Sequence, residues 1–253
     1  MHRGSSHRFL FYSKELDRPS KSVELNGDEH HHASKVLRLN TGDIVFVTNG
    51  RGLISRCEVE DIGRATTRLG VRGLEVDARV NRPLTLALGC LKKDAFEQAV
   101  RQCTELGVDC CVPFASQKSH LKEYTGVFLE RLRRVALASM KQSFRATLPV
   151  IEGAIQFDEL IARARRAELV IVGDSDGDPL TEDPAQRSLM IIVGPEGGFT
   201  EREKTDLSSI GSIYASVSSN RLRSETAAAS LAAVVQGLRR GRATGATDSI
   251  DSP

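Results

Sequence analysis

The sequence predicts an α/β protein in which a small β-barrel module precedes a larger domain built on a mainly parallel sheet. Residues 1 to about 77 contain short strand-like runs separated by turn signals, which is typical of a small barrel. From Leu84 on, strand-like and helix-like segments alternate, and this alternation favours a parallel sheet covered by helices. We therefore expect domains at 1–77 and 78–243, followed by a disordered tail at 244–253 that is rich in Gly, Ser, Thr and Asp.

The first module has three strand signals and one helix signal. Apolar runs predict strands at Phe9–Tyr12, Ile44–Val47 and Leu53–Val59. The stretch Asn49-Gly50-Arg51-Gly52 is a hairpin signal between the last two runs. Asp28 is the predicted cap of a short helix that continues through Leu37.

The second domain is predicted from apolar runs and helical periodicity. The expected strands are Leu84–Leu88, Val108–Phe114, Leu169–Gly173, Met190–Val193 and Ile213–Val217, and the expected helices are Lys93–Leu106, Val127–Ser143 and Phe157–Arg166. Thr200 followed by Glu203 is a capping box that opens another helix, and Ser224 is the predicted cap of the last one. Thr226 to Val235 is small or apolar around its whole circumference, which predicts a helix buried on every side.

Two loops near the carboxyl terminus are the strongest site candidates. The first, Gly194–Gly198, holds three glycines and a proline directly after a strand, so its backbone can lie close to a ligand. The second, Ser218–Ala227, follows the next strand. Two such junctions place both loops at the carboxyl edge of one sheet, where open α/β sheets bind ligands. The sequence lacks G-x-x-x-x-G-K-[ST] and a G-x-G-x-x-G after a strand, which disfavours nucleoside triphosphates and Rossmann dinucleotides.

Composition limits the class of partner. The 253-residue chain has a net charge of +2, so nucleic-acid binding would depend on local basic patches. No window of 18 apolar residues and no signal-peptide core occurs, from which we expect a cytoplasmic protein without membrane contact. The five cysteines are expected to be reduced, buried thiols. We expect no metal site: Asp174–Asp178 lacks the later ligands of a calcium loop and is interpreted as a solvated loop.

The glycine loop Gly194-Pro195-Glu196-Gly197-Gly198, followed by Leu222-Arg223-Ser224-Glu225-Thr226-Ala227, resembles the RsmE-type family of ribosomal RNA uridine-N3 methyltransferases. These are knotted S-adenosylmethionine (SAM) enzymes of the SPOUT class. His32–Arg38, Glu105–Val108 and Gln142–Arg145 resemble further family segments, so the likeness covers nearly the whole chain. It implies a PUA-like RNA-binding first module and a SPOUT-type sheet with a deep trefoil knot. It also implies SAM as methyl donor, 16S rRNA of the small ribosomal subunit as substrate, and a homodimer.

The same resemblance implies roles for individual residues. The implied cofactor-binding residues are Gly194, Pro195, Glu196, Gly197, Gly198, Ser219, Asn220, Leu222, Arg223 and Thr226. Arg223 is the candidate for stabilising charge on the uracil oxygens, and Glu196 and Glu225 are the available catalytic carboxylates. Glu225 also has a structural interpretation, because an acid in the first turn of a helix complements the helix dipole. The expected RNA-binding residues are Arg38, Arg134, Arg145 and Arg221.

The chain departs from the family pattern at a few positions. Many family members have glycine and arginine where Ser218 and Asn220 stand, and glutamate where Lys141 stands. Arg221 is the neighbouring candidate for the role of the missing arginine. Two other functions stay open from the sequence: a knotted enzyme that methylates ribose 2′-OH or another base, and a non-catalytic RNA-binding factor.

Overall fold

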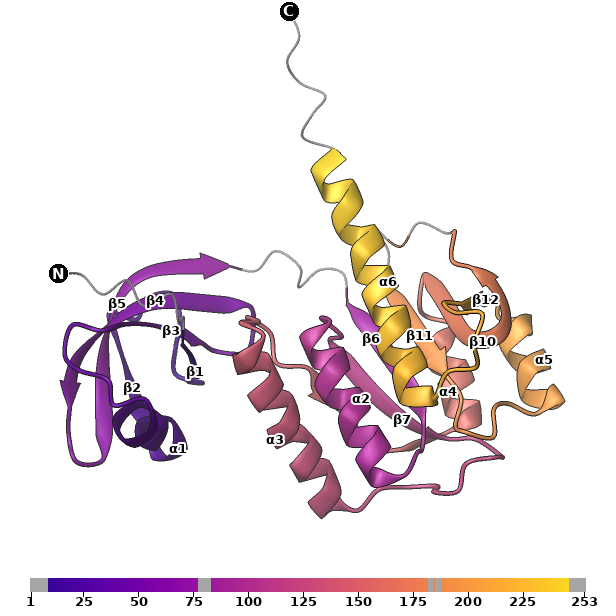
Figure 1. Cartoon of the computed structure of the whole chain (residues 1–253), viewed down its shortest axis with the longest axis horizontal. Helices are drawn as coiled ribbons and strands as arrows, with labels where there is room; N and C mark the ends of the chain where they lie inside the picture. Colours follow the sequence, from indigo (N-terminus) through magenta and orange to yellow (C-terminus); the bar gives the residue numbers. More distant parts are fainter. Residues whose placement is uncertain (1–8, 77–82, 182–183, 185–187, 246–253) are drawn as a thin grey trace, which may run out of the picture. The chain divides into compact units, whose positions relative to one another are not determined.

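The computed structural model describes residues 9–76, 83–181, 184 and 188–245. From residue 246 on, the predicted tail lies outside the described residues. The chain divides into two compact units. Unit 1 comprises Met1–Asn81 together with Met140–Leu148, and unit 2 comprises Arg82–Ser139 together with Pro149–Pro253. Figure 1 labels most of the helices and strands of both units.

Unit 1 is a five-stranded mixed sheet with one helical segment. Its elements are β1 (Leu10–Tyr12), β2 (Ser22–Asn26), α1 (Gly27–His31), the π-helical turn η1 (His32–Val36), β3 (Ile44–Thr48), β4 (Leu53–Ile62) and β5 (Thr66–Val76). The strand order is β1-β3-β4-β5-β2, with β1 parallel to β3 and the other pairs antiparallel. The three predicted strands are confirmed. The long strands β4 and β5 pair with register shifts after Arg56 and Val59, and irregularities of this kind bend a sheet.

Two features of unit 1 follow from its sequence pattern. Alternate residues of β4 are buried, and residues such as Phe11, Val45 and Val59 form an apolar core with no exposed surface. The predicted Asp28 cap is wrong: α1 begins at Gly27, so Asp28 lies inside the first turn, where its charge complements the helix dipole.

The segment Met140–Leu148 belongs to unit 1 by its contacts. The carbonyl oxygen of Ala146 accepts hydrogen bonds from Thr48 Oγ1 at 2.8 Å and from the Gly52 amide at 3.1 Å. The Leu148 amide donates to the Gly50 carbonyl at 2.8 Å. The segment begins with the last three residues of helix α3 (Gly126–Gln142), most of which lies in unit 2, and these contacts explain why it belongs to the first unit.

A second set of contacts holds the start of the same segment. The Lys141 ammonium lies 2.5 Å from Glu29 Oε1, and both side chains are largely buried. Phe144 packs edge-on against Phe46 with ring centroids 5.0 Å apart. Lys141, one of the departures from the family pattern, therefore has an ion-pair partner within unit 1.

Unit 2 alternates strands and helices as predicted. Its elements are β6 (Leu84–Gly89), α2 (Lys93–Glu105), β7 (Cys110–Ala115), α3 (Gly126–Gln142), β8 (Val150–Ile151), β9 (Ile155–Gln156), α4 (Phe157–Ala164), β10 (Leu169–Pro179), β11 (Leu189–Val193), α5 (Glu201–Ser209), β12 (Ile213–Ser216) and α6 (Ser224–Gly245). The strand order is β12-β10-β11-β6-β7-β8, and β9 also pairs with β7. Every pairing in this sheet is parallel, which confirms the predicted α/β fold class.

Helices cover both faces of the parallel sheet. Met190 and Ile192 of the central strand β11 join a core cluster with apolar residues of α4 and α5. The alternate residues Ile191 and Val193 are also buried, on the face covered by α2 and α6. A strand with apolar residues on both faces reads as a continuous apolar run, and β11 has this pattern because it is central.

The last helix has a buried and an exposed apolar side. Ala228, Leu231, Ala232 and Val235 are buried, where α6 packs against α2 and β11. Val234 and Leu238 are each 37% exposed on the single chain. The prediction of burial on every side is therefore met only in part by unit 2 itself. The trefoil knot stays a prediction of the resemblance.

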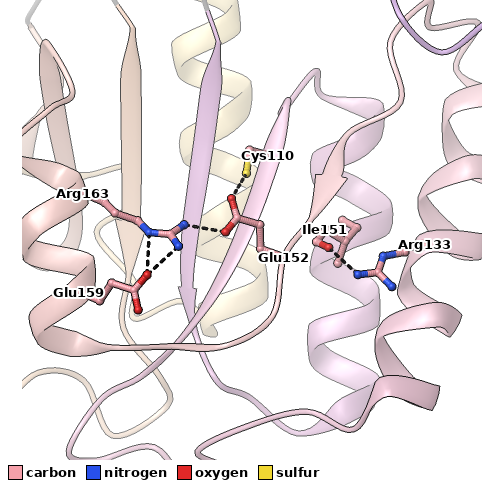
Figure 2. A network of polar contacts seen from close by, with 6 residues as sticks. All are labelled: Cys110, Arg133, Ile151, Glu152, Glu159 and Arg163. Atoms are coloured by element: carbon pink, nitrogen blue, oxygen red, sulfur yellow. Dashed lines mark hydrogen bonds and ion pairs between the residues drawn. The ribbon is translucent and has the colours of Figure 1, made fainter.

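A polar network joins the far edge of the sheet to helix α4 (Figure 2). Arg163 donates to Glu152 Oε2 at 2.6 Å and to Glu159 Oε1 at 2.7 and 3.1 Å. Glu152 Oε1 accepts from the Cys110 thiol at 3.4 Å. The three charged side chains are at least one-third exposed, so each pair contributes about 0–1 kcal/mol to stability. Glu152, which lies between β8 and β9, is thereby linked to Cys110 of β7 and to Arg163 of α4.

The cysteines match the prediction of free thiols. Cys57, Cys90, Cys103 and Cys111 are buried, and Cys110 is half-buried. Burial raises the pKa of Cys103 to about 12, so this thiol stays protonated at neutral pH.

Candidate ligand cavity at the carboxyl edge of the sheet

The two predicted loops meet in one cavity of about 590 Å³. The glycine loop follows β11 and the second loop follows β12, and these strands are separated in the sheet only by β10. Parallel strands end at the same edge, so both loops reach the same side. The cavity is lined by Lys118, Gly173, Asp174, Ser175, Asp176, Val193, Gly194, Pro195, Glu196, Gly197, Gly198, Phe199, Glu201, Lys204, Ala215, Ser216, Val217, Ser218, Asn220, Arg221, Leu222, Arg223, Ser224, Ala227 and Leu231.

The glycine loop needs its glycines at defined places. Gly198 has φ +67°, a left-handed conformation that side chains other than glycine rarely adopt, and its amide donates to the Pro195 carbonyl at 2.8 Å. A Cβ at Gly194 would lie 3.1 Å from the Phe199 ring, and one at Gly197 would lie 3.0 Å from Lys118 Cβ. The loop is therefore a tight turn with backbone exposed to the cavity and side chains packed behind it.

The second loop is held by its own polar side chains and by the first loop. The Asn220 amide donates to Ser218 Oγ at 3.0 Å, and Ser216 Oγ donates to the Ser218 carbonyl at 2.9 Å. Arg221 Nη2 donates to the Glu196 carbonyl oxygen at 3.4 Å, which links the two loops. Arg223 is exposed at the cavity and immediately precedes α6. The predicted Ser224 cap is wrong: α6 begins at Ser224, so Ser224 lies in the first turn and Arg223 is the residue before the helix.

Of the residues predicted to bind the cofactor or to take part in catalysis, most line the cavity and three do not, and the predicted RNA-binding residue Arg221 lines it as well. Those at the cavity are Gly194, Pro195, Glu196, Gly197, Gly198, Asn220, Arg221, Leu222 and Arg223. Ser219, Glu225 and Thr226 lie outside its lining, among the residues that the structure describes. Glu225 is buried at 6% exposure in the first turn of α6, where a negative charge complements the helix dipole.

Sequence reasoning missed the acidic stretch Asp174–Asp176. β10 pairs with β12 up to Gly173 and again from Asp178, so the residues between them bulge out of the ladder. Gly177 allows this, because a Cβ there would lie 2.8 Å from the backbone of Tyr214 and Ala215. β10 is the strand between the two loops, and its bulge therefore forms part of the cavity wall. The stretch is largely exposed, as predicted, but it belongs to strand β10 and not to a loop. Gly177, after three polar residues, was the available sequence signal for the bulge.

The cavity lining carries charges of both signs. Asp174, Asp176, Glu196 and Glu201 supply carboxylates, and Lys118, Lys204, Arg221 and Arg223 supply cations. Lys204 Nζ lies 3.7 Å from Asp174 Oδ2, which balances part of the acidic wall. Such a cavity suits a ligand that itself carries both charges.

Two buried titratable groups outside the cavity lining stay neutral. Tyr124 is buried, and its hydroxyl donates to the Leu91 carbonyl at 2.8 Å and accepts from the Leu91 amide at 2.9 Å. Burial raises the pKa of Tyr124 far above that of a free phenol. Burial also raises the pKa of Cys90, to about 11. Neither group is suited to exchange protons at neutral pH.

The predicted RNA-binding arginines differ in exposure. Arg38 in unit 1 and Arg134 on α3 of unit 2 are exposed, as is Arg221 at the cavity. Arg145 is only 7% exposed, so its guanidinium is largely withdrawn from the surface.

The described residues contain no group of three or more His, Cys, Asp or Glu side chains arranged to hold a metal ion. Among the described helices, none has the length and hydropathy needed to cross a membrane.

Comparison with known proteins supports the same two regions. Residues 78–236 match the family model of an RNA methyltransferase domain, and residues 25–66 match that of an RNA methyltransferase PUA domain. The chain is 29% identical to the ribosomal RNA small subunit methyltransferase E of Mycobacterium bovis, over 87% of this chain and 88% of that one.

Solved structures give the same picture. A probable rRNA-methyltransferase from Porphyromonas gingivalis is 28% identical, with a TM-score of 0.78 over 92% of this chain and 99% of that one. A ribosomal RNA small subunit methyltransferase E from Neisseria gonorrhoeae, solved with S-adenosyl methionine, is 22% identical and shares the fold, with a TM-score of 0.80 over 92% and 98%. With its parallel sheet, its cavity at the carboxyl edge and its PUA-like first unit, this chain belongs to the RNA methyltransferase domain family.

Proposed function

We propose that the chain is a SAM-dependent methyltransferase that methylates N3 of a specific uridine in 16S rRNA of the small ribosomal subunit. The observation that carries this proposal is the meeting of the glycine loop with Arg221 and Arg223 in one cavity, in a chain of the RNA methyltransferase family. The relative from Mycobacterium bovis bears the name of a small subunit rRNA methyltransferase, which supports the choice of substrate.

The cavity fits SAM in size, backbone access and charge. Its volume of about 590 Å³ lies in the usual range for small-molecule sites, roughly 300–1,000 Å³. SAM has a cationic ammonium and sulfonium and an anionic carboxylate, and the lining offers Asp174 and Asp176 as well as Lys118 and Arg223. Gly194, Gly197 and Gly198 would hold the cofactor through backbone groups, with Leu222 as an apolar contact. When bound, SAM supplies an electrophilic methyl group.

The exposure of Arg223 at the cavity supports a role in which it acts on the uracil. Uracil N3 carries a proton that must leave as the new bond forms, and the departing proton leaves negative charge that is shared with the neighbouring carbonyl oxygens. Arg223 is exposed, lines the cavity and directly precedes helix α6, which fixes the position of its backbone. A positioned donor at a developing charge lowers the barrier most when it is already in place. The target base must also be unpaired or flipped out, because N3 lies on the Watson–Crick edge.

The two candidate carboxylates differ in their access to this chemistry. Glu196 is exposed and lines the cavity, so it can accept the N3 proton directly or through a water molecule. Glu225 is buried outside the lining, and its first-turn position supports a structural role. Of the two, we therefore propose Glu196 as the proton acceptor.

The proposed partners follow from the surfaces of the two units. Unit 1 is PUA-like and exposes Arg38, which supports a contact with RNA phosphates. Arg134 and Arg221 are the exposed candidates in unit 2. Val234 and Leu238 leave an apolar strip on α6 that a second copy of the chain would cover, which supports a homodimer. A ribosomal substrate implies action in the cytoplasm.

Nucleoside mass spectrometry tests the proposal. Purified protein is incubated with SAM and with small ribosomal subunits or naked 16S rRNA that lack the modification, and the RNA is digested to nucleosides. We expect 3-methyluridine. A 2′-O-methylated nucleoside or another methylated base would point to a related knotted enzyme. Binding of RNA without any SAM affinity by calorimetry would point to a non-catalytic factor.

A further inference from the structure

One buried carboxylate joins two segments of the cavity wall. Glu203, in the first turn of α5, is 5% exposed. Its Oε2 accepts hydrogen bonds from the Thr200 amide at 2.8 Å and from Thr200 Oγ1 at 3.0 Å. Its Oε1 accepts from the Gln117 amide at 2.8 Å. The first oxygen completes the predicted capping box, while the second binds a loop 86 residues earlier in the chain.

The loop held by Glu203 contributes a wall of the cavity. Lys118, the residue after Gln117, lines the cavity, and its ammonium donates to the Phe199 carbonyl at 3.0 Å. Lys118 also lies against the glycine loop, since a Cβ at Gly197 would be 3.0 Å from Lys118 Cβ. An ammonium has three protons, so Lys118 keeps donors for a ligand while it is bound to Phe199.

The loop from Ser116 to Lys122 is also held together by hydrogen bonds of its own. Lys122 Nζ donates to the carbonyls of Ser116 at 2.5 Å and Gln117 at 3.1 Å. The Ser116 amide donates to Ser119 Oγ at 3.1 Å. These hydrogen bonds close the loop on itself, and the Gln117–Glu203 bond links it to the start of α5.

A helix cap alone does not account for this arrangement. A capping box needs one carboxylate oxygen and the Thr200 hydroxyl. The second oxygen of Glu203 accepts a hydrogen bond from the Gln117 amide instead. The two oxygens of a carboxylate lie in one plane at a fixed separation. Glu203 therefore fixes the position of the Lys118 wall relative to the end of the glycine loop.

We propose that Glu203 is a positioning residue of the ligand site, which holds Lys118 in place as a binding residue of the cavity wall. This inference rests on the proposed function, because it takes SAM as the ligand of the cavity. If Glu203 served only as part of the helix cap, its replacement would not be expected to change the affinity for SAM. The SAM affinity therefore distinguishes a positioning role from a capping role.

The test compares two variants with the unaltered full-length chain. In Glu203→Gln, the amide group can accept at only one end, so either Thr200 or Gln117 loses its acceptor. In the matched control Thr200→Val, the cap hydroxyl is lost but both oxygens of Glu203 keep their backbone donors. SAM affinity is measured by calorimetry at a temperature where both variants are fully folded. We expect Glu203→Gln to bind SAM roughly tenfold more weakly, the scale of one hydrogen bond to a charged group. Thr200→Val should bind within about twofold of the unaltered chain, a difference of about 0.4 kcal/mol.

A double-substitution cycle tests the link to Lys118. Lys118→Met should also weaken SAM binding, and Lys118→Arg should restore part of it. If Glu203 acts through Lys118, adding Glu203→Gln to Lys118→Met should weaken binding little further, because the positioned group is already gone. Equal affinity of Glu203→Gln and Thr200→Val, or fully additive losses in the cycle, would overturn the proposal.

A second readout is independent of SAM. Trypsin cleaves after Lys118 and Lys122, and cleavage should be faster in Glu203→Gln than in Thr200→Val because the loop has lost its anchor. Equal cleavage rates would overturn the positioning role. An unaltered chain without SAM affinity would instead overturn the proposed function, and the cleavage rates would still report on Glu203.

Discussion

Gly89, at the end of β6, lies directly beneath Pro195 of the glycine loop. A Cβ on Gly89 would be 2.5 Å from the Pro195 nitrogen, 2.6 Å from its Cδ and 3.0 Å from the Gly194 carbonyl carbon. Two of these three atoms belong to the backbone of a buried turn, which cannot give way as a flexible side chain would. The neighbouring strand therefore sets how deeply the glycine loop sits in the sheet edge.

Gly89→Ala should displace the glycine loop. The added methyl group should cost about 1–3 kcal/mol of unfolding free energy, the range for overpacking a core, and should weaken SAM binding. Gly126→Ala is the control, because a Cβ there meets nothing within 4 Å. Urea unfolding and SAM calorimetry check both variants. Normal SAM affinity in Gly89→Ala would show that the loop tolerates displacement.

Arg223→Ala should reduce the chemical step while SAM binding stays nearly intact. The loss expected for one donor at a developing charge is about a hundredfold or more. Arg223→Lys should recover only part of the rate, because it keeps the charge without the planar fork. Single-turnover rates at saturating RNA and SAM measure the effect. The control is Arg202→Ala, because Arg202 is exposed on α5 and does not line the cavity.

A different outcome for Arg223 has its own interpretation. If Arg223 only binds an RNA phosphate, the loss should appear as weaker RNA binding and should recover at low salt or high RNA concentration. A full rate for Arg223→Ala at saturation would rule out the catalytic role.

Val234→Glu and Leu238→Glu should weaken the proposed homodimer. Both side chains are 37% exposed on the single chain, so a charge there need not disturb the core of unit 2. Ala232 is fully buried, and Ala232→Glu would unfold the unit before it reported on assembly. Light scattering at micromolar concentration measures the assembly. Val127→Glu, at an apolar position that is 81% exposed elsewhere, should leave it unchanged. A monomeric unaltered chain would contradict the dimer.

Thr48→Val should loosen the attachment of Met140–Leu148 within unit 1. The Thr48 hydroxyl donates to the Ala146 carbonyl and accepts from the Gly50 amide at 3.1 Å, and Thr48 is fully buried. Loss of these bonds should cost about 1–3 kcal/mol, because buried polar groups lose a partner. Urea unfolding measures the loss, with Thr205→Val on the exposed side of α5 as control. Unchanged stability would mean that the segment is held by its other contacts.

The stability contributed by Glu203 should depend on pH with a defined sign. Burial alone would raise the pKa of this carboxyl, but hydrogen bonds from Thr200 and Gln117 hold the pKa below its ordinary value. A carboxyl whose pKa is lower in the folded state stabilises the fold above its unfolded pKa of about 4.3. That contribution is lost as pH falls through the lower, folded pKa. The difference in unfolding free energy between the unaltered chain and Glu203→Gln should therefore shrink below about pH 4. A difference that stays constant from pH 7 to 3 would contradict this.

The sequence alone determined the fold class and both loops of the site. Local features were enough for these: the apolar run before Gly194, the glycines themselves, and the capping box from Thr200 to Glu203, which the structure confirms. Such signals lie within a few residues of each other, and the parallel alternation then places the ends of β11 and β12 at one edge.

Tertiary structure decided the rest of the cavity wall. The bulge at Asp174–Asp176 enters the site because β10 lies between β11 and β12, and strand order cannot be read from a single sequence. Lys118 lines the cavity next to Gln117, whose amide donates a hydrogen bond to Glu203 across 86 residues, and a contact of this range leaves no periodic pattern in the sequence. The Met140–Leu148 segment continues a helix in sequence, yet its buried polar groups find their partners in unit 1. Pairing between distant residues is fixed only when the chain folds, because it depends on which surfaces the other elements leave free.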